Sequence, residues 1–158
     1  YITSPVIMRL LEERLPIKSI TVMVQKEAAD RLCAEIGGRE CGAISVAVNY
    51  YCKPVQLFKV SRGSFMPPPN VDSAVIRLDI LTENKYGVED EKLFFRIVRA
   101  SFAQRRKQLV NPLSAELKIS KARLAEYLAS CNIKPTARPE ELKMDDFVAL
   151  YKKIKKEL

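Results

Sequence analysis

A short proline-rich segment contains the residues of this 158-residue sequence whose types most clearly suggest chemistry. Phe65 is followed by Met66 and three successive prolines, Pro67 to Pro69. Prolines hold φ near the polyproline II value, so the backbone leaving Phe65 is stiff and the ring has little freedom to retreat. An aromatic ring on a rigid loop can stack on a planar group. It can also plug the end of a sheet while the prolines protect a strand edge, and the physics of the segment alone favours this structural interpretation.

Two polar residues, Asp72 and Ser73, follow this segment directly. They could lie beside a molecule that the loop binds. Short polar side chains at the start of a strand also bond to nearby backbone groups. We expect this capping role, with Ser73 bonding to backbone, rather than direct catalysis.

A basic cluster, Arg105, Arg106 and Lys107, is the second candidate for chemistry. Adjacent guanidinium and ammonium groups suit RNA phosphates and neutralise several charges at once. The structural alternative is that these cations end a helix and complement its dipole, which contributes roughly 0.3–1 kcal/mol. A second group of lysines near the end of the sequence is expected to form a solvated helix face. It comprises Lys152, Lys153, Lys155 and Lys156.

Several kinds of site are excluded by residue types that are missing or badly spaced. The sequence has no histidine, which removes the Ser-His-Asp and Cys-His nucleophile schemes. The four cysteines, at positions 33, 41, 52 and 131, form no CxxC pair. We therefore predict no structural metal, and we expect reduced thiols that pack as small apolar groups.

The overall composition is that of a folded protein, with 47% hydrophobic and 29% charged residues and a net charge of +8. The length suits one domain, or one domain with a small appendage. No apolar run approaches the roughly 20 residues that a membrane span needs, and no targeting signal is evident at the start. We expect a soluble intracellular protein. The sequence opens with Tyr1 rather than Met, which is compatible with a piece of a longer protein.

The first half of the sequence alternates between helical and strand patterns. Ser4 before Pro5 is typical of a helix start. The proline-rich segment joins two predicted strands, which permits a hairpin. The predicted elements are a helix from Ser4 to Pro16, a strand over 19–24, a helix over 26–36, an apolar stretch over 43–48 interpreted as helix, and strands over 55–60 and 71–81.

From residue 83 the pattern becomes entirely helical. The first predicted helix runs from Phe94 to Leu109 and ends near the basic cluster, the second is capped by Ser120, and the third follows Phe147. Charge changes at the same place. Residues 1–82 contain 10 basic and 8 acidic side chains, whereas residues 83–158 contain 17 and 11. The helical part therefore carries most of the positive charge.

Five motifs, in order along nearly the whole chain, make this sequence resemble the KsgA-type (RsmA) rRNA adenine dimethyltransferases. They are Tyr1-Ile2-Thr3-Ser4-Pro5, Val24-Gln25-Lys26-Glu27, Asn49-Tyr50-Tyr51-Cys52, Phe65 to Val75, and Ala100 to Lys107. Enzymes of that family use S-adenosylmethionine to dimethylate N6 of two adjacent adenosines near the 3′ end of small-subunit (16S) rRNA. The resemblance implies a cytoplasmic protein of ribosome biogenesis whose partners are that rRNA and the 30S subunit or its precursor.

The resemblance also implies an α/β fold, with the C-terminal part of a Rossmann-like class I methyltransferase domain over 1–82 and a helical rRNA-contacting domain over 83–158. Phe65 would stack on the target adenine, and Arg105, Arg106 and Lys107 would contact RNA. The cofactor loop and main catalytic motif of the family would precede Tyr1. We therefore expect no cofactor-binding residue in this sequence and no activity from it alone, and we expect the strand over 19–24 to lack one neighbour.

Two rival functions stay open. One is a macrolide-resistance methyltransferase acting on large-subunit rRNA, a sister family in which asparagine is commoner at the position of Asp72. The other is a non-catalytic ribosome-assembly or RNA-binding factor of the same fold. The first differs in the rRNA that it methylates, and the second would have a degenerate cofactor loop or catalytic motif.

Overall fold

The computed structural model describes residues 2–158, so Tyr1, the first residue of one family motif, lies outside the described residues. The chain forms two compact units. The first unit contains the residues up to 35 together with residues 44–84. The second contains residues 85–158 and a short segment, residues 36–43, that comes from the first half of the sequence.

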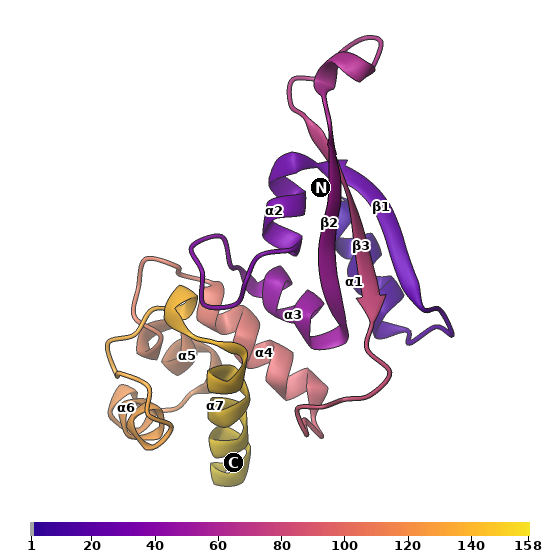
Figure 1. Ribbon diagram of the computed structural model, residues 1–158. Helices are drawn as coiled ribbons and strands as arrows, with labels where there is room; N and C mark the ends of the chain where they lie inside the picture. The colour runs from indigo at the N-terminus through magenta and orange to yellow at the C-terminus, as the bar shows by residue number, and fades with distance from the viewer. Residues whose placement is uncertain (1) are drawn as a thin grey trace. The chain divides into compact units, whose positions relative to one another are not determined.

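A three-stranded antiparallel sheet forms the centre of the first unit (Figure 1). Its strands are β1 (Ser19–Gln25), β2 (Cys52–Val60) and β3 (Ser73–Ile80), in the order β1-β3-β2. Central strand β3 alternates, so that Ala74, Ile76 and Leu78 are almost completely buried. This period of two places its apolar side chains on one face, as a half-buried strand requires.

Three helices accompany this sheet: α1 (Thr3–Glu12), α2 (Lys26–Leu32) and α3 (Ala43–Tyr51). Helix α2 packs against all three strands and buries Ala29 and Leu32. The predicted helix over 43–48 is confirmed and extends to Tyr51. The prediction of a helix over 26–36 was too long, because α2 ends at Leu32.

Strand β1 has a hydrogen-bonded neighbour on one side only among the described residues. It pairs with β3 from Ser19 opposite Asp79 to Gln25 opposite Ser73. Its side chain at Met23 is 52% exposed. An edge strand of this kind presents unpaired backbone groups, as the sequence led us to expect.

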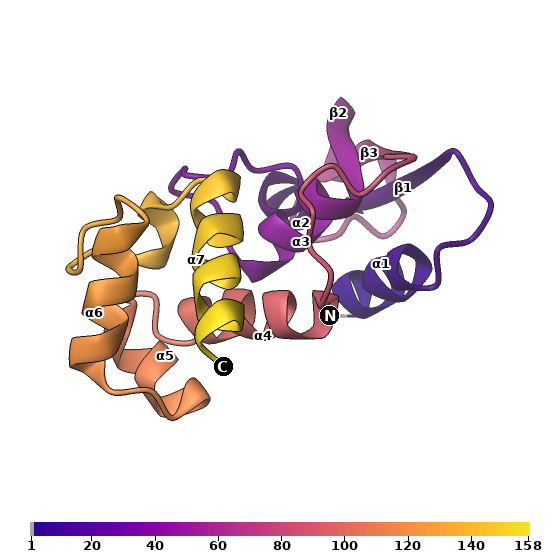
Figure 2. The ribbon, with the colours of Figure 1, turned by 90° about the horizontal axis from the view of Figure 1, so that it is seen from below.

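Four helices make up most of the second unit: α4 (Glu91–Phe102), α5 (Val110–Leu117), α6 (Lys121–Ser130) and α7 (Met144–Glu157) (Figure 2). Helix α4 packs against α5 and α7, and α6 packs against the same two helices. Asp90 and Ser120 cap α4 and α6 by accepting hydrogen bonds from backbone N–H groups. The buried centre includes Phe94, Leu124, Phe147 and Tyr151. No helix within residues 2–158 is long and apolar enough to cross a membrane.

The prediction of one long helix from Phe94 to Leu109 was wrong. Helix α4 ends at Phe102, and α5 begins at Val110. Residues 103–109 lie outside both helices and include a turn closed by a hydrogen bond from the Lys107 N–H to the Gln104 carbonyl at 2.8 Å. In the first turn of the separate helix α5, the missing N–H of Pro112 has no cost.

Candidate functional site: a hairpin loop and a basic turn

The loop that joins β2 to β3 carries Phe65 and projects beyond the end of the sheet (Figure 1). It starts with a short 3₁₀ helix, Arg62–Ser64. Ser61 stabilises this turn, since its hydroxyl accepts a hydrogen bond from the Gly63 N–H at 3.3 Å and its carbonyl accepts one from the Ser64 N–H at 3.0 Å. Phe65 then leaves the turn in an extended conformation.

The exposure of this loop indicates a presented surface rather than a core. Phe65 is half-buried, whereas the fully buried side chains of the first unit lie in its sheet and helices. Met66 is 95% exposed, and Pro67 to Pro69 are exposed as well. The ring of Phe65 is therefore less buried than the core side chains, and the loop around it offers apolar groups to solvent.

Asp72 closes the base of the loop. Its Oδ1 accepts a hydrogen bond from the backbone N–H of Arg62 at 2.9 Å, and its Oδ2 lies 3.1 Å from the ammonium of Lys59. The Arg62 N–H, and then Lys59, hold the pKa of Asp72 below its usual range. The expected local structural role is therefore seen for Asp72, although it bonds across the loop rather than within the strand.

A second polar cluster joins the start of α2 to strand β2. Lys26 contacts the carboxylate of Asp30, which also accepts a hydrogen bond from the Gln56 amide at 2.9 Å. These two side chains hold the pKa of Asp30 below its usual range, chiefly through their hydrogen bonds. The backbone N–H of Lys26 in turn donates to the carbonyl of Asp72 at 2.9 Å. The base of the loop is thus tied to α2 as well.

Arg105 has a structural task within the second unit. Its guanidinium donates hydrogen bonds to the carbonyls of Arg39 at 3.0 Å and Cys41 at 3.2 Å. These carbonyls belong to the segment 36–43, which folds as part of the same unit. Arg105 therefore fastens a distant segment to the basic turn.

The other two residues of the basic cluster, Arg106 and Lys107, are exposed. They lie in a turn that follows the last residue of α4, Phe102, and this turn is closed by a hydrogen bond from the Lys107 N–H to the Gln104 carbonyl at 2.8 Å. The expectation that the cluster ends the helix was wrong. The basic residue in the last turn of α4 is instead Arg99, so Arg106 and Lys107 are exposed cations outside the helix.

Two of the four cysteines, Cys41 and Cys52, are buried. Burial raises the pKa of Cys52 to about 12. The Cys52 thiol donates to the Val48 carbonyl at 3.0 Å, which suits a packing role. Among residues 2–158 no group of three or more His, Cys, Asp or Glu side chains is placed to hold a metal ion.

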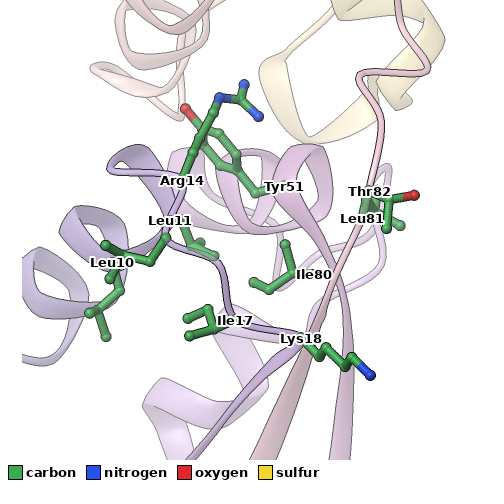
Figure 3. A pocket seen from close by; sticks show the side chains of 10 residues that line it. Leu10, Leu11, Arg14, Ile17, Lys18, Tyr51, Ile80, Leu81 and Thr82 are labelled. Carbon is green, nitrogen blue, oxygen red and sulfur yellow. The ribbon is translucent and has the colours of Figure 1, made fainter.

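A hollow of about 350 Å³ lies at the opposite end of the sheet from the Phe65 loop (Figure 3). Leu11, Ile17 and Ile80 are among its apolar lining residues, and the guanidinium of Arg14 lies over the ring of Tyr51, 5.3 Å from its centroid. Its position separates this hollow from the Phe65 loop.

Comparison with known proteins places this geometry in context. The sequence profile of the ribosomal RNA adenine dimethylases matches residues 1–156. The chain belongs to this family. The curated relatives include the ribosomal RNA small subunit methyltransferase A of Alkaliphilus oremlandii, which is 47% identical over 100% of this chain and 55% of its own length. The chain therefore spans about half the length of the curated relatives that it matches.

Solved structures agree on the fold of this family member, a Rossmann-like methyltransferase fold of the α/β class. A dimethyladenosine transferase from Plasmodium falciparum superposes with a TM-score of 0.78 at 24% identity, over 99% of this chain and 64% of its own. The 23S rRNA methyltransferase ErmE superposes with a TM-score of 0.68 at 21% identity, over 98% of this chain and 61% of its own.

Sequence reasoning singled out the candidate residues of this family member but missed the contacts that arrange them. The partners of Arg105 lie more than 60 residues away in the sequence, and no local pattern signals such a contact. The pair Lys59–Asp72 was detectable in principle, because opposite charges flank a predicted hairpin loop and the register brings them together.

Proposed function

We propose that the whole protein is an S-adenosylmethionine-dependent rRNA adenine N6-dimethyltransferase that acts on two adjacent adenosines near the 3′ end of small-subunit rRNA. It would work in the cytoplasm during small-subunit biogenesis, on the 30S subunit or its precursor. The observation that carries the proposal is the half-buried Phe65 on a projecting, proline-stiffened loop, in a chain of the rRNA adenine dimethylase family.

The proposed role of Phe65 follows from the needs of the reaction. An enzyme that modifies a base must first take it out of its stack and then hold it against aromatic or apolar side chains. Stacking of a base on an aromatic ring contributes roughly 1–3 kcal/mol. The ring of Phe65 and its exposed neighbour Met66 provide such a surface at the end of the sheet.

We propose that the described residues do not form a cofactor site by themselves. Rossmann-like sheets bind such cofactors at glycine-rich turns that follow a strand. Here β1 ends at Gln25 and α2 begins at Lys26, so no glycine lies between this strand and the helix after it. S-adenosylmethionine supplies the methyl group in the proposed reaction, and we assign none of residues 2–158 to its binding.

The basic turn would contact RNA phosphates. Arg106 and Lys107 present exposed cations, which position nucleic acid without reading its sequence. Arg105 is committed to the carbonyls of Arg39 and Cys41, so within the predicted cluster we assign the phosphate contacts to the other two residues. The second unit would thereby serve as the rRNA-contacting part.

Incubation of the whole protein with labelled S-adenosylmethionine and purified ribosomal subunits tests the proposed function. The subunits should come from cells that lack this methylation, and the modified nucleotides should be mapped by mass spectrometry of the rRNA. We expect N6,N6-dimethyladenosine at two adjacent positions of the small-subunit rRNA. Methylation of large-subunit rRNA alone would favour the resistance-type function, and binding without methylation would favour an assembly factor.

A further inference from the structure

One residue, Asp72, contacts three separate segments at the base of the Phe65 loop. The side chain of Asp72 binds the Arg62 N–H at the start of the loop and the ammonium of Lys59 at the end of β2. Its carbonyl accepts the N–H of Lys26 at the start of α2. Asp72 itself lies immediately before β3, so the contacts of this one residue connect both arms of the hairpin and the start of helix α2.

The two arms of the loop are held in different ways. The outgoing arm, Ser61 to Ser64, is a turn stabilised by its own local hydrogen bonds. The returning arm, from Met66 to Val71, is exposed and stiffened by its prolines. A stiff segment transmits the orientation of its ends, so the direction of Phe65 depends on how the returning arm is fixed at Asp72.

We propose that Asp72 is a positioning residue that fixes the hairpin loop in the conformation that presents Phe65 to the target base. The inference rests on the proposed function and adds a residue that acts through Phe65 rather than on the base. The bond that Asp72 makes to Arg62 spans ten residues of chain and closes the loop. The ion pair with Lys59, at 3.1 Å, adds a second point of attachment.

The negative charge of Asp72 contributes to the attachment of the loop through the ion pair with Lys59. The charged groups that face its carboxylate are Lys59 and Arg62, and the low pKa of Asp72 keeps it ionised at neutral pH. Asp72→Asn would keep an oxygen to accept the Arg62 N–H but would lose the ion pair. Asp72→Ala would lose both attachments, and Lys59→Gln only the ion pair.

A fluorine label gives a readout of the loop that does not depend on methylation. The whole protein is labelled with 4-fluorophenylalanine, and the ¹⁹F resonance of residue 65 is assigned by its loss in Phe65→Leu. Asp79→Asn is the matched control, because Asp79 lies on β3, the strand that follows Asp72, in a part-exposed ion pair 2.9 Å from Arg77. We expect Asp72→Ala to move the resonance toward its denatured value, Asp72→Asn and Lys59→Gln to move it less, and Asp79→Asn to leave it in place.

The second measurement is the rate of methyl transfer by the same variants. We expect the kcat of Asp72→Ala to fall about tenfold with a smaller change in KM, within the hundredfold that a 1 Å displacement can cost. An unmoved resonance in Asp72→Ala would overturn the inference, as would a moved resonance with unchanged kcat. Failure of the wild-type protein to methylate any rRNA would instead contradict the proposed function, while the fluorine signal would still show whether Asp72 fixes the loop.

Discussion

Two loops of the molecule, one in each compact unit, are fastened in the same way but present different chemistry. In the first unit Asp72 binds a backbone N–H and an ammonium, and in the second unit Arg105 binds two backbone carbonyls. In each loop, one charged side chain binds other groups of the same unit and so holds the loop in place. The residues exposed beside it are apolar in the first loop and basic in the second, as Met66 and Arg106 illustrate.

Under the proposed function, this difference corresponds to two tasks, holding a base and binding RNA phosphates. An apolar surface on a stiff loop can hold a base that has left its stack. Exposed cations bind phosphates and position the RNA without selecting a base. The comparison also shows that neighbouring charged residues are not equivalent, because Arg105 acts on the protein itself while Arg106 and Lys107 stay accessible.

The largest effect is expected at Phe65. Loss of the ring in Phe65→Ala should lower kcat/KM for methyl transfer by the whole protein by about 5-fold to 150-fold, since stacking contributes roughly 1–3 kcal/mol. Phe58→Ala is the matched control, because Phe58 is 59% exposed on strand β2 of the same hairpin. Methyl-transfer kinetics and thermal melting should be measured together. Normal transfer by Phe65→Ala with a lower melting temperature would show that the ring only supports the fold.

The next effect concerns the exposed cations of the basic turn. The double variant Arg106→Ala, Lys107→Ala should weaken binding to small subunits and reduce the slope of log affinity against log salt by about 1.4–1.8, as expected for two lost phosphate contacts. The double variant Lys152→Ala, Lys156→Ala on α7 removes the same charge from a face that we expect to be solvated. A salt titration of binding compares the two. If the slope of log affinity against log salt is the same for both double variants, the basic turn has no specific role in binding RNA phosphates.

A smaller effect on stability is expected at Arg105. Arg105→Ala removes two hydrogen bonds to the segment 36–43 and should lower the free energy of unfolding by roughly 1 kcal/mol, because the guanidinium is exposed and water replaces part of the interaction. The thiol of Cys41, which is 0% exposed, should then react faster with iodoacetamide. Arg106→Ala should leave that rate unchanged. The same rate in both variants would show that Arg105 does not hold the segment.

The smallest expected effect is a difference in reactivity among the native thiols. Cys131 and Cys33 are half-buried, and burial raises the pKa of Cys33 above its usual value. Cys52 is buried with a pKa of about 12, so it has almost no thiolate near pH 8. Mass spectrometry after alkylation should find labelling fastest at Cys131, slower at Cys33 and slowest at Cys52. Rapid labelling of Cys52 would mean that helix α3 and strand β2 open at their junction.

Elements with a clear hydrophobic period could be predicted from the sequence. Strand β1 and helix α7 follow their periods closely, and Ser120 caps α6 as expected. The boundary of α4 was missed because apolar residues continue at helical spacing to Leu109, whereas the chain leaves the helix after Phe102. Local periodicity reports which face is buried, and it does not report where two helices separate.

The candidate site was predictable in its residue types but not in its contacts. The prolines around Phe65 indicated a stiff loop, and the structure shows that loop projecting from the sheet. The attachment of Arg105 to residues 36–43 depends on a segment far away in the sequence. The carbonyls of Arg39 and Cys41 approach the guanidinium of Arg105 only in the folded chain. The sequence therefore predicted one cluster of three equivalent basic residues.

The central claim is that the Phe65 loop receives the target base, and cross-linking tests it most directly. A photoreactive benzoylphenylalanine in place of Phe65 is irradiated in the whole protein bound to unmethylated small subunits, with the same replacement at Phe58 as the control. The attached nucleotide is mapped by primer extension and mass spectrometry. The account predicts an adduct at the two adjacent adenosines for position 65 and none there for position 58. An adduct from position 65 only at other nucleotides, in subunits that the protein does methylate, would contradict it.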